Sequence, residues 1–219
     1  MNINKFTYKG AIFDLDGTLT DSMWIWDTVI LHWLERRQLR CDAVVSDLTD
    51  ATMCMTFDES AKYIVRHLGL DMPAAAVAGE WKSMLIDDYR MCIPLKEGVR
   101  DFLRRLSSDG IRMCVATSNF REACAAVLEA HKINNYFDFI ITSDEVGKNK
   151  NSPDIYLTSA KKMGLTPREC MVFEDITPAV CAAKSAGFQT TGVYDAHAGA
   201  EGLREIADNY IVSFRGILA

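Results

Sequence analysis

The sequence predicts an α/β fold, in which helices cover both faces of a parallel sheet and an all-helical domain is inserted after the first strand. After residue 92, short apolar segments alternate with helical patterns, which is typical of parallel strands that are buried on both faces. Residues 20–91 contain only helical patterns. We therefore expect a core domain of residues 1–19 plus 92–219 and a helical domain of residues 20–91.

The first strand is predicted over residues 11–13, an apolar run. Asp14 and Asp16 come directly after it, and Gly17 allows the chain to turn there. Ligands of open parallel sheets bind where the strands end. Two crowded carboxylates repel each other, which raises one of their pKa values unless a cation lies between them. The pair therefore indicates a hard metal ion or a division of work between a nucleophile and a proton donor, although a solvated turn can have the same composition.

Helical periodicity divides the inserted domain into successive segments. Asp21 or Ser22 is predicted to cap the first helix, and Thr56 with Glu59 forms a capping-box pattern at the start of the third. Gly69 is expected to end that third helix, and a proline opens the fourth. Helices are predicted over residues 23–37, 43–49, 56–68 and 73–89.

The core domain continues with alternating helices and strands. Gly110, Gly164 and Gly187 each follow a helical pattern and are expected to end it, since glycine is common just after helices. Helices are predicted over residues 98–108, 120–131, 153–163, 178–186 and 200–207, and strands over residues 112–116, 139–142, 171–173, 190–194 and 210–212.

The composition is that of a soluble globular protein, because 49% of the 219 residues are hydrophobic and 25% are charged. A net charge of −6 without a basic run argues against nucleic acid as a partner. The seven cysteines form no Cys-x-x-Cys pair and are odd in number, which favours buried thiols over disulfides or zinc. No apolar stretch could span a bilayer, and the first ten residues lack a signal-peptide core. We therefore expect a cytoplasmic protein that does not act at a membrane.

Polar side chains follow four of the predicted strands. Strands of one parallel sheet end at the same edge, so these groups should converge on one crevice. Carboxylates, a hydroxyl and an ammonium group together match a magnesium–phosphate site, since Mg²⁺ prefers oxygen ligands and lysine holds phosphate as a point charge. Taken singly, each group is also typical of a helix cap or a solvated loop. The groups are Asp14, the Thr117, Ser118 and Asn119 segment, Lys148 or Lys150, and Glu174 with Asp175.

Residues 14–19, DLDGTL, match the first motif of the haloacid dehalogenase superfamily of phosphatases. The chain resembles the phosphoglucomutase and phosphatase branch of that superfamily, in which a helical cap is inserted after the first strand. The resemblance covers nearly the whole chain and implies a Rossmann-like parallel sheet core with an all-helical cap domain. It also implies that Asp14 is the nucleophile and a Mg²⁺ ligand. Asp16 would be the general acid/base, with its backbone carbonyl on the metal.

The same resemblance implies roles for residues at two further strand ends. Thr117, with Ser118 beside it, matches the hydroxyl of the second motif, which binds phosphate. Glu174 and Asp175 match the acidic fourth motif, which completes the metal site.

Lys150 matches the phosphate-binding lysine of the third motif, because residues 153–156 follow it at the family's spacing. Lys148 is close enough to leave this choice open. Asn151 stands where the family usually has proline, and Ile176 where it often has a small polar residue. These departures touch the edge of the expected site and leave its charges in place.

The implied function is that of a magnesium-dependent phosphatase, which hydrolyses a small phosphorylated metabolite through an aspartyl-phosphate intermediate. A sugar phosphomutase of the β-phosphoglucomutase type is the alternative, but residues 52–57 are apolar where a glycine-containing loop of basic and polar residues is expected. A carbon–halogen hydrolase is disfavoured because such enzymes lack an acid at the position of Asp16. A non-catalytic binding module is disfavoured because the full set of charged residues is present.

One cap residue is predicted to shape the substrate site. Trp24 and Trp26 follow the nucleophile loop closely, and helical spacing places Trp26 on an inner stripe with Val29 and Trp33. Trp24 is turned by roughly 200° from Trp26 at 3.6 residues per turn. We therefore expect Trp24 to face the crevice and to contact the leaving group, with packing of both rings among the cap helices as the alternative.

Overall fold

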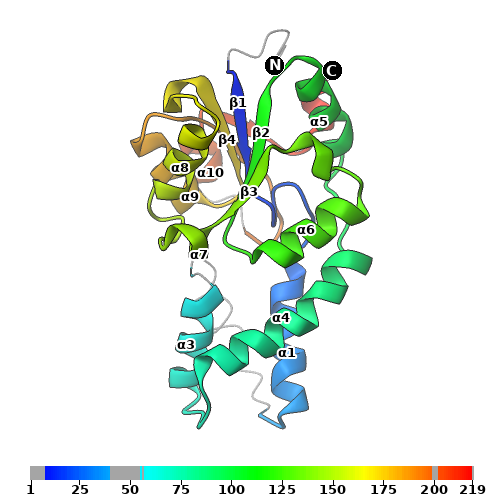
Figure 1. Ribbon diagram of the computed structural model, residues 1–219, viewed down its shortest axis with the longest axis vertical. Helices are drawn as coiled ribbons and strands as arrows, with labels where there is room; N and C mark the ends of the chain where they lie inside the picture. The colour runs from blue at the N-terminus through cyan, green and yellow to red at the C-terminus, as the bar shows by residue number, and fades with distance from the viewer. Residues whose placement is uncertain (1–7, 40–54, 56, 199–201, 219) are drawn as a thin grey trace.

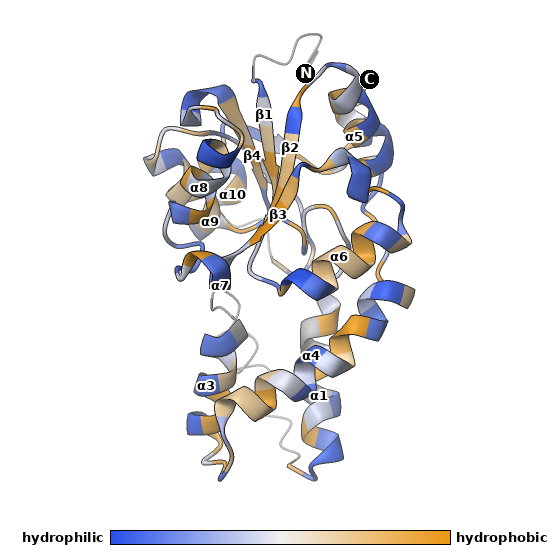
Figure 2. Cartoon of the chain, viewed as in Figure 1, coloured by the Kyte–Doolittle hydropathy of each residue, from blue (hydrophilic) through white to orange (hydrophobic). Residues whose placement is uncertain are grey.

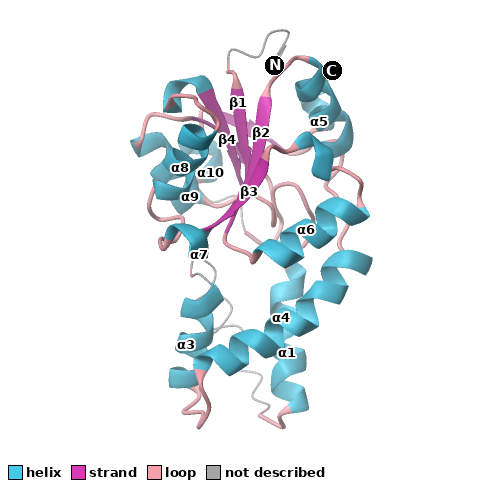
Figure 3. Ribbon diagram, in the orientation of Figure 1, coloured by secondary structure: helices cyan, strands magenta, loops and turns pink. Residues whose placement is uncertain are grey.

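The computed structural model describes residues 8–39, 55, 57–198 and 202–218. In this part of the chain, six strands form one sheet in the order β3-β2-β1-β4-β5-β6 (Figure 1, Figure 3). All neighbouring strands run parallel, which confirms the predicted α/β fold. The strands are β1 (Gly10–Phe13), β2 (Arg112–Thr117), β3 (Phe139–Thr142), β4 (Cys170–Glu174), β5 (Gln189–Val193) and β6 (Asn209–Ile211).

The first strand lies in the interior of the sheet, between β2 and β4. Phe13 is in register with Val115 on one side and with Phe173 on the other. Ala11 and Phe13 pack into the apolar cluster on one face of the sheet, and Ile12 packs into the cluster on the opposite face. Successive side chains of a strand point to opposite faces, so a strand covered on both faces needs the unbroken apolar run found here.

Helices cover both faces of the sheet. The helices α5 (Val99–Ser108) and α6 (Arg121–Ala130) belong to the first apolar cluster. The helices α8 (Asp154–Lys162) and α9 (Thr177–Ser185) belong to the second. Figure 2 shows strands that are mostly hydrophobic beside helices that carry both hydrophilic and hydrophobic residues. Short segments complete the core: α7 (Ser143–Val146), α10 (Leu203–Ile206), α11 (Arg215–Leu218) and 3-10 turns at Asn134–Tyr136 and Pro167–Glu169.

The described helices of the segment that we propose as the cap are α1 (Trp24–Arg36), α3 (Phe57–His67) and α4 (Ala74–Met91). These helices lie beyond the carboxyl ends of the strands, and α4 also reaches α6 of the core (Figure 1). The predicted helix over residues 43–49, and Thr56 of the predicted capping box, lie outside the described residues. Among the helices that are described, none is long and apolar enough to cross a membrane.

The two segments that connect the cap with the core pair with each other. Thr20 forms an antiparallel bridge with Leu95. The backbone N–H of Asp21 donates to the carbonyl of Pro94 at 3.0 Å. This pairing brings both ends of the inserted domain to one place beside the first strand, and it supports residues 20–91 as the proposed extent of the cap.

Candidate active site

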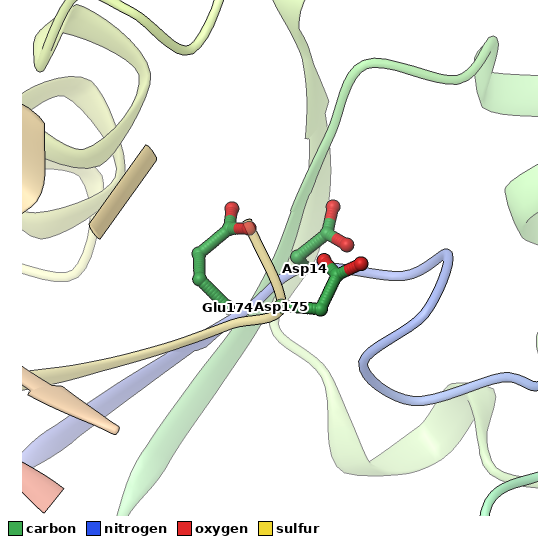
Figure 4. Close-up of side chains that lie close together, drawn as sticks. All are labelled: Asp14, Glu174 and Asp175. Carbon is green, nitrogen blue, oxygen red and sulfur yellow. The ribbon is translucent and has the colours of Figure 1, made fainter. Parts of the chain in front are cut away.

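Three carboxylates meet where β1 and β4 end (Figure 4). Asp14 follows β1, Glu174 is the last residue of β4, and Asp175 comes next. Because Phe13 is in register with Phe173, Asp14 and Glu174 leave the sheet side by side. One oxygen of each carboxylate lies within 4.8 Å of the others, and all three residues are buried. The structure therefore brings together groups that are far apart in the sequence.

Lys150 places a positive charge among these carboxylates. Its Nζ donates to Glu174 Oε1 at 2.5 Å and also to Asp14 Oδ1. Burial lowers the pKa of Lys150, but the charges of Asp14 and Glu174 outweigh this effect and raise the pKa above its ordinary value. Lys150 is buried, whereas Lys148 is exposed. Of the two lysines in this loop, Lys150 is the one that contacts the carboxylates.

Two oxygens of the cluster, Glu174 Oε2 and Asp175 Oδ2, are buried without a hydrogen-bond donor among the described residues. The other oxygens of these carboxylates are held by hydroxyls, since Tyr156 donates to Glu174 at 2.7 Å and Thr18 donates to Asp175 at 3.4 Å. Burial and the charges of Asp14 and Glu174 raise the pKa of Asp175. Buried carboxylate oxygens without donors suit a hard cation, so this donor set fits a divalent metal ion.

Gly17 allows the loop after the first strand to approach the carboxylate cluster. Its φ is +81°, a left-handed conformation that glycine adopts without strain. A Cβ atom at this position would lie 2.2 Å from Asp175 Oδ2. Any side chain here would therefore displace a carboxylate of the site as well as strain the backbone.

Asp16 accepts hydrogen bonds from uncharged donors. Ser22 Oγ donates to its Oδ1 at 2.6 Å, the Tyr89 hydroxyl donates to the same oxygen, and Asn119 Nδ2 donates to Oδ2 at 3.0 Å. Burial and the nearby charge of Asp14 raise the pKa of Asp16 to about 6, although these hydrogen bonds lower it. A carboxyl group with such a pKa can both give and take a proton near neutral pH.

The residues predicted to bind phosphate lie at the same edge of the sheet. Thr117 ends β2 and is buried, and its Oγ1 accepts the backbone N–H of Asn119 at 2.9 Å. Ser118 Oγ lies 3.2 Å from Ser143 Oγ, which follows the end of β3. Because β2 lies between β1 and β3, Thr117 ends the strand beside the one that carries Asp14, while the Ser118 hydroxyl contacts the segment after β3.

One local prediction is wrong. The residue at the N-cap of α1 is Met23, and it makes no side-chain capping bond. Asp21 and Ser22 therefore do not have the predicted capping role, and the Ser22 hydroxyl binds Asp16 instead. The contact of Tyr89 with Asp16 was also missed. The two residues are 73 positions apart, and a tyrosine in the last turn of a helix carries no sequence signal for such a contact.

Trp24 is half-buried at the start of α1 and packs against the main apolar cluster. Its indole N–H donates to the backbone carbonyl of Asp21 at 3.0 Å. The side chain of Trp26 lies outside the part of the structure that is described. A role for Trp24 toward a substrate therefore stays a prediction.

Known proteins resemble this chain over most of its length. A family model described as haloacid dehalogenase-like hydrolase matches residues 11–193. Fructose-1-phosphate phosphatase YqaB of Escherichia coli (strain K12) is 29% identical over 194 residues, which are 85% of this chain and 96% of that protein. Hexitol phosphatase A of the same organism is 28% identical over 189 residues, covering 84% and 82% of the two chains. β-Phosphoglucomutase of Bacillus subtilis (strain 168) is 29% identical over 192 residues, covering 84% of this chain and 83% of that protein.

Solved structures share the fold. CbbY from Rhodobacter sphaeroides in complex with phosphate has a TM-score of 0.83 at 22% sequence identity, and the match covers 94% of this chain and 95% of that chain. The family match includes every strand-end residue of the site, from Asp14 to Asp175. The chain therefore belongs to the haloacid dehalogenase-like hydrolases.

Proposed function

We propose that this protein is a magnesium-dependent phosphatase that hydrolyses a small phosphorylated metabolite. The observation that carries the proposal is the different surroundings of two neighbouring aspartates. Asp14 lies with two other carboxylates and the Lys150 ammonium group, whereas Asp16 is held by uncharged donors. The similarity to a fructose-1-phosphate phosphatase and a hexitol phosphatase supports a sugar or polyol phosphate as substrate.

The two aspartates divide the reaction between them. An oxygen of Asp14 attacks phosphorus, the bond between phosphorus and the leaving oxygen breaks, and Asp16 gives its proton to that oxygen. Asp14 then carries the phosphoryl group as an aspartyl-phosphate. In the second step, Asp16 takes a proton from the water that attacks phosphorus. Inorganic phosphate leaves, and both aspartates return to their starting states.

The groups beside Asp14 are suited to bind the phosphoryl oxygens. Lys150 Nζ already contacts Asp14, so its charge lies next to the oxygen that attacks. The hydroxyls of Thr117 and Ser118, at the end of the neighbouring strand, would donate hydrogen bonds to the same phosphoryl group. Together these residues would hold the phosphorus in line with the attacking oxygen.

The side chains of Asp14, Glu174 and Asp175, with the backbone carbonyl of Asp16, would hold the metal ion. The two buried oxygens without donors support a cation at this place, and the all-oxygen donor set supports Mg²⁺. When bound, Mg²⁺ supplies positive charge that offsets the charge gathered on the phosphoryl oxygens.

We place the enzyme in the cytoplasm, where thiols stay reduced. The described cysteines are all free, and three of them are buried: Cys114, Cys124 and Cys170, with Cys92 and Cys181 exposed. The acidic net charge of −6 supports a small metabolite rather than nucleic acid as the partner.

The similarity to β-phosphoglucomutase favours a second candidate function, in which the phosphoryl group returns to a sugar phosphate instead of passing to water. A panel of phosphorylated metabolites, assayed with and without Mg²⁺, separates the two. We expect Mg²⁺-dependent release of inorganic phosphate from at least one sugar or polyol phosphate, and none from Asp14→Asn. Isomerisation of a sugar phosphate without phosphate release would favour the mutase. If a folded protein supplied with Mg²⁺ catalyses neither reaction, a binding module would be favoured.

A further inference from the structure

Asp16 is held by donors from three different parts of the chain. Ser22 lies in the segment that enters the cap, Asn119 follows β2 of the core, and Tyr89 lies in the last turns of the cap helix α4. Tyr89 is the donor contributed by a cap helix. The position of the cap and the orientation of this carboxyl group are therefore physically connected.

The contact is rigid on the side of the tyrosine. Tyr89 has no exposed surface and belongs to the main apolar cluster, so its ring has little freedom to turn. The helix that carries it is seated on α6 of the core, where Lys82 donates to Glu122 at 2.8 Å and its ammonium group lies 5.1 Å from the centre of the Phe120 ring. The phenol can reach Asp16 only while α4 stays packed against α6 in this position.

The core side of the contact is equally well defined. Asn119 Oδ1 accepts the backbone N–H of Phe120 at 2.8 Å, which fixes the amide so that its Nδ2 donates to Asp16. One carboxyl oxygen is thus held from the core, and the other is held by the Ser22 and Tyr89 hydroxyls. Without the phenol, Ser22 would be the one remaining donor to Oδ1 among the residues that the structure describes.

We propose that Tyr89 is a positioning residue for proton transfer: its phenol holds Asp16 in the orientation that serves the leaving oxygen, and it does so only when the cap is seated on the core. The inference rests on the proposed phosphatase function and adds to it a cap residue that acts through Asp16. Its signature is selectivity for the leaving group. A leaving alcohol needs a proton as the bond to phosphorus breaks, whereas p-nitrophenolate leaves without one.

The test compares kcat/KM for an alkyl phosphate and for p-nitrophenyl phosphate, because kcat/KM reports on the step in which the leaving group departs. Tyr89→Phe removes only the hydroxyl. We expect it to lower kcat/KM for the alkyl phosphate by about 10-fold or more and to change the value for p-nitrophenyl phosphate by less than about 3-fold, since a hydrogen bond to a charged group makes a contribution of this size. The measurements are made at a temperature at which all variants are folded.

Two further variants control for loss of a tyrosine hydroxyl. Tyr63→Phe changes a half-buried cap tyrosine whose ring stacks on that of His67, with 5.5 Å between the ring centres. This change should leave kcat/KM for both substrates unaffected. Tyr156→Phe removes the buried donor to Glu174. We expect it to lower kcat/KM for both substrates by a similar factor and to raise the Mg²⁺ concentration that the enzyme requires. In the double variant Asp16→Asn with Tyr89→Phe, the second change should have no further effect, because both act on the same proton transfer.

Equal losses on both substrates after Tyr89→Phe, or no loss on either, would overturn the positioning role while leaving the phosphatase proposal intact. A wild-type protein that releases no phosphate from any substrate with Mg²⁺ present would refute the proposed function itself, and the role of Tyr89 with it.

Discussion

Asp14 and Asp16 are two positions apart, yet their side chains contact groups of different kinds. Asp14 shares its surroundings with Glu174, Asp175 and the Lys150 ammonium group. Asp16 receives hydrogen bonds from hydroxyl and amide donors, and its pKa is raised to about 6. Environments that differ in this way suit a nucleophile and a proton donor, because a carboxyl group with a raised pKa, such as Asp16, can hold a proton near neutral pH.

Asp14→Asn is expected to abolish turnover while the protein stays folded. An amide does not attack phosphorus usefully and is a poorer metal ligand than a carboxylate. Phosphate release measured beside a circular dichroism spectrum checks this expectation. A folded Asp14→Asn protein with near-normal activity would show that the nucleophile has been assigned wrongly.

Asp16→Asn is expected to impair the chemical step more than substrate binding. Loss of general acid–base help typically lowers the rate by about 10²–10⁴-fold, so kcat should fall by that factor with little change in KM. Single-turnover kinetics at saturating Mg²⁺ isolates the step. If Asp16→Asn instead needs only more Mg²⁺ to regain full activity, Asp16 acts chiefly at the metal.

At the scale of residues, the sequence predicted the groups that follow strands but not the groups that hold them. Asp14 and Glu174 could be found because strand ends in a parallel sheet share one edge. Ser22 is predicted to cap α1 because serine is common at helix N-caps, but its hydroxyl donates to Asp16 instead. Tyr89 reaches Asp16 only through the packing of α4 on the core, which no local pattern encodes.

At the scale of elements, the segment that leads from the cap back to the core is anchored to β5. Lys96 Nζ lies 2.8 Å from a carboxylate oxygen of Asp195, just after β5, and also donates to the carbonyl of Tyr194 at 2.6 Å. The two side chains are 13% and 2% exposed, so the pair is nearly removed from water. Burial raises the pKa of Asp195, but the hydrogen bond and charge of Lys96 outweigh it and hold the pKa below its usual range.

Lys96→Met should therefore destabilise the protein in a pH-dependent way. A depressed pKa means that the pair stabilises the fold above the pKa of an unfolded Asp, about 3.9, and that this contribution disappears as the pH falls through the lower folded value. We expect a loss of about 3 kcal/mol near pH 7, since Asp195 is left buried without its partner. The difference from wild type should shrink below about pH 4.

Urea unfolding across this pH range measures the difference. His197→Gln is the matched control, because the exposed His197 ring lies 3.9 Å from Asp195 while only its backbone N–H bonds to that carboxylate. A constant difference between Lys96→Met and wild type at all pH values would contradict the expectation.

The start of α1 gives a second prediction at this scale. Trp24→Ala should change the ranking of phosphomonoester substrates with little loss of stability, because Trp24 is half-buried and we expect it to face the leaving group. Trp26→Ala should cost about 3–5 kcal/mol if its ring is packed in the cap as the helical spacing predicts. Melting temperatures and substrate ranking for both variants decide the matter. If both variants lower the melting temperature equally and the substrate ranking does not change, both tryptophan rings serve only to pack the cap helices.

Element boundaries were predictable where glycine or an apolar run marks them, and less so elsewhere. Strand β3 has the predicted bounds, while β6 begins one residue earlier than expected. The four-residue helices α7 and α11 were not predicted, because one turn is too short to show a helical period.

At the scale of the whole molecule, the alternation of strands and helices was sufficient to predict the fold class. The order of the strands was not predictable in the same way, because an apolar run predicts that a strand is buried but not which strand lies beside it. The order matters for the site, since it makes β2 and β4 the neighbours of β1 and so gathers the polar strand ends around Asp14.

Mg²⁺ should raise the melting temperature of the intact protein. A ligand that binds only the folded state at 100 times its Kd adds about 2.7 kcal/mol, which corresponds to a shift of roughly 5–10 °C for a chain of this size. Asp175→Asn should reduce the shift, because one of the buried oxygens without a donor is removed. Thermal unfolding with Mg²⁺ and with EDTA measures it, and an identical melting temperature in both would contradict a folded-state metal site.

The interior position of β1 sets the order in which the newly made chain can assemble. Lys150 follows Asp14 by 136 residues, and Asp175 follows Thr18 by 157. At ribosomal rates of about 5–20 residues per second, Asp14 waits roughly 7–30 s for Lys150 and Asp175, and throughout that time β1 lacks its neighbour β4. The helices of the insert are made early in that interval, and α4 gains its contacts with the core once α6 has followed. Translation therefore makes the helical insert first and the last residues of the proposed active site much later.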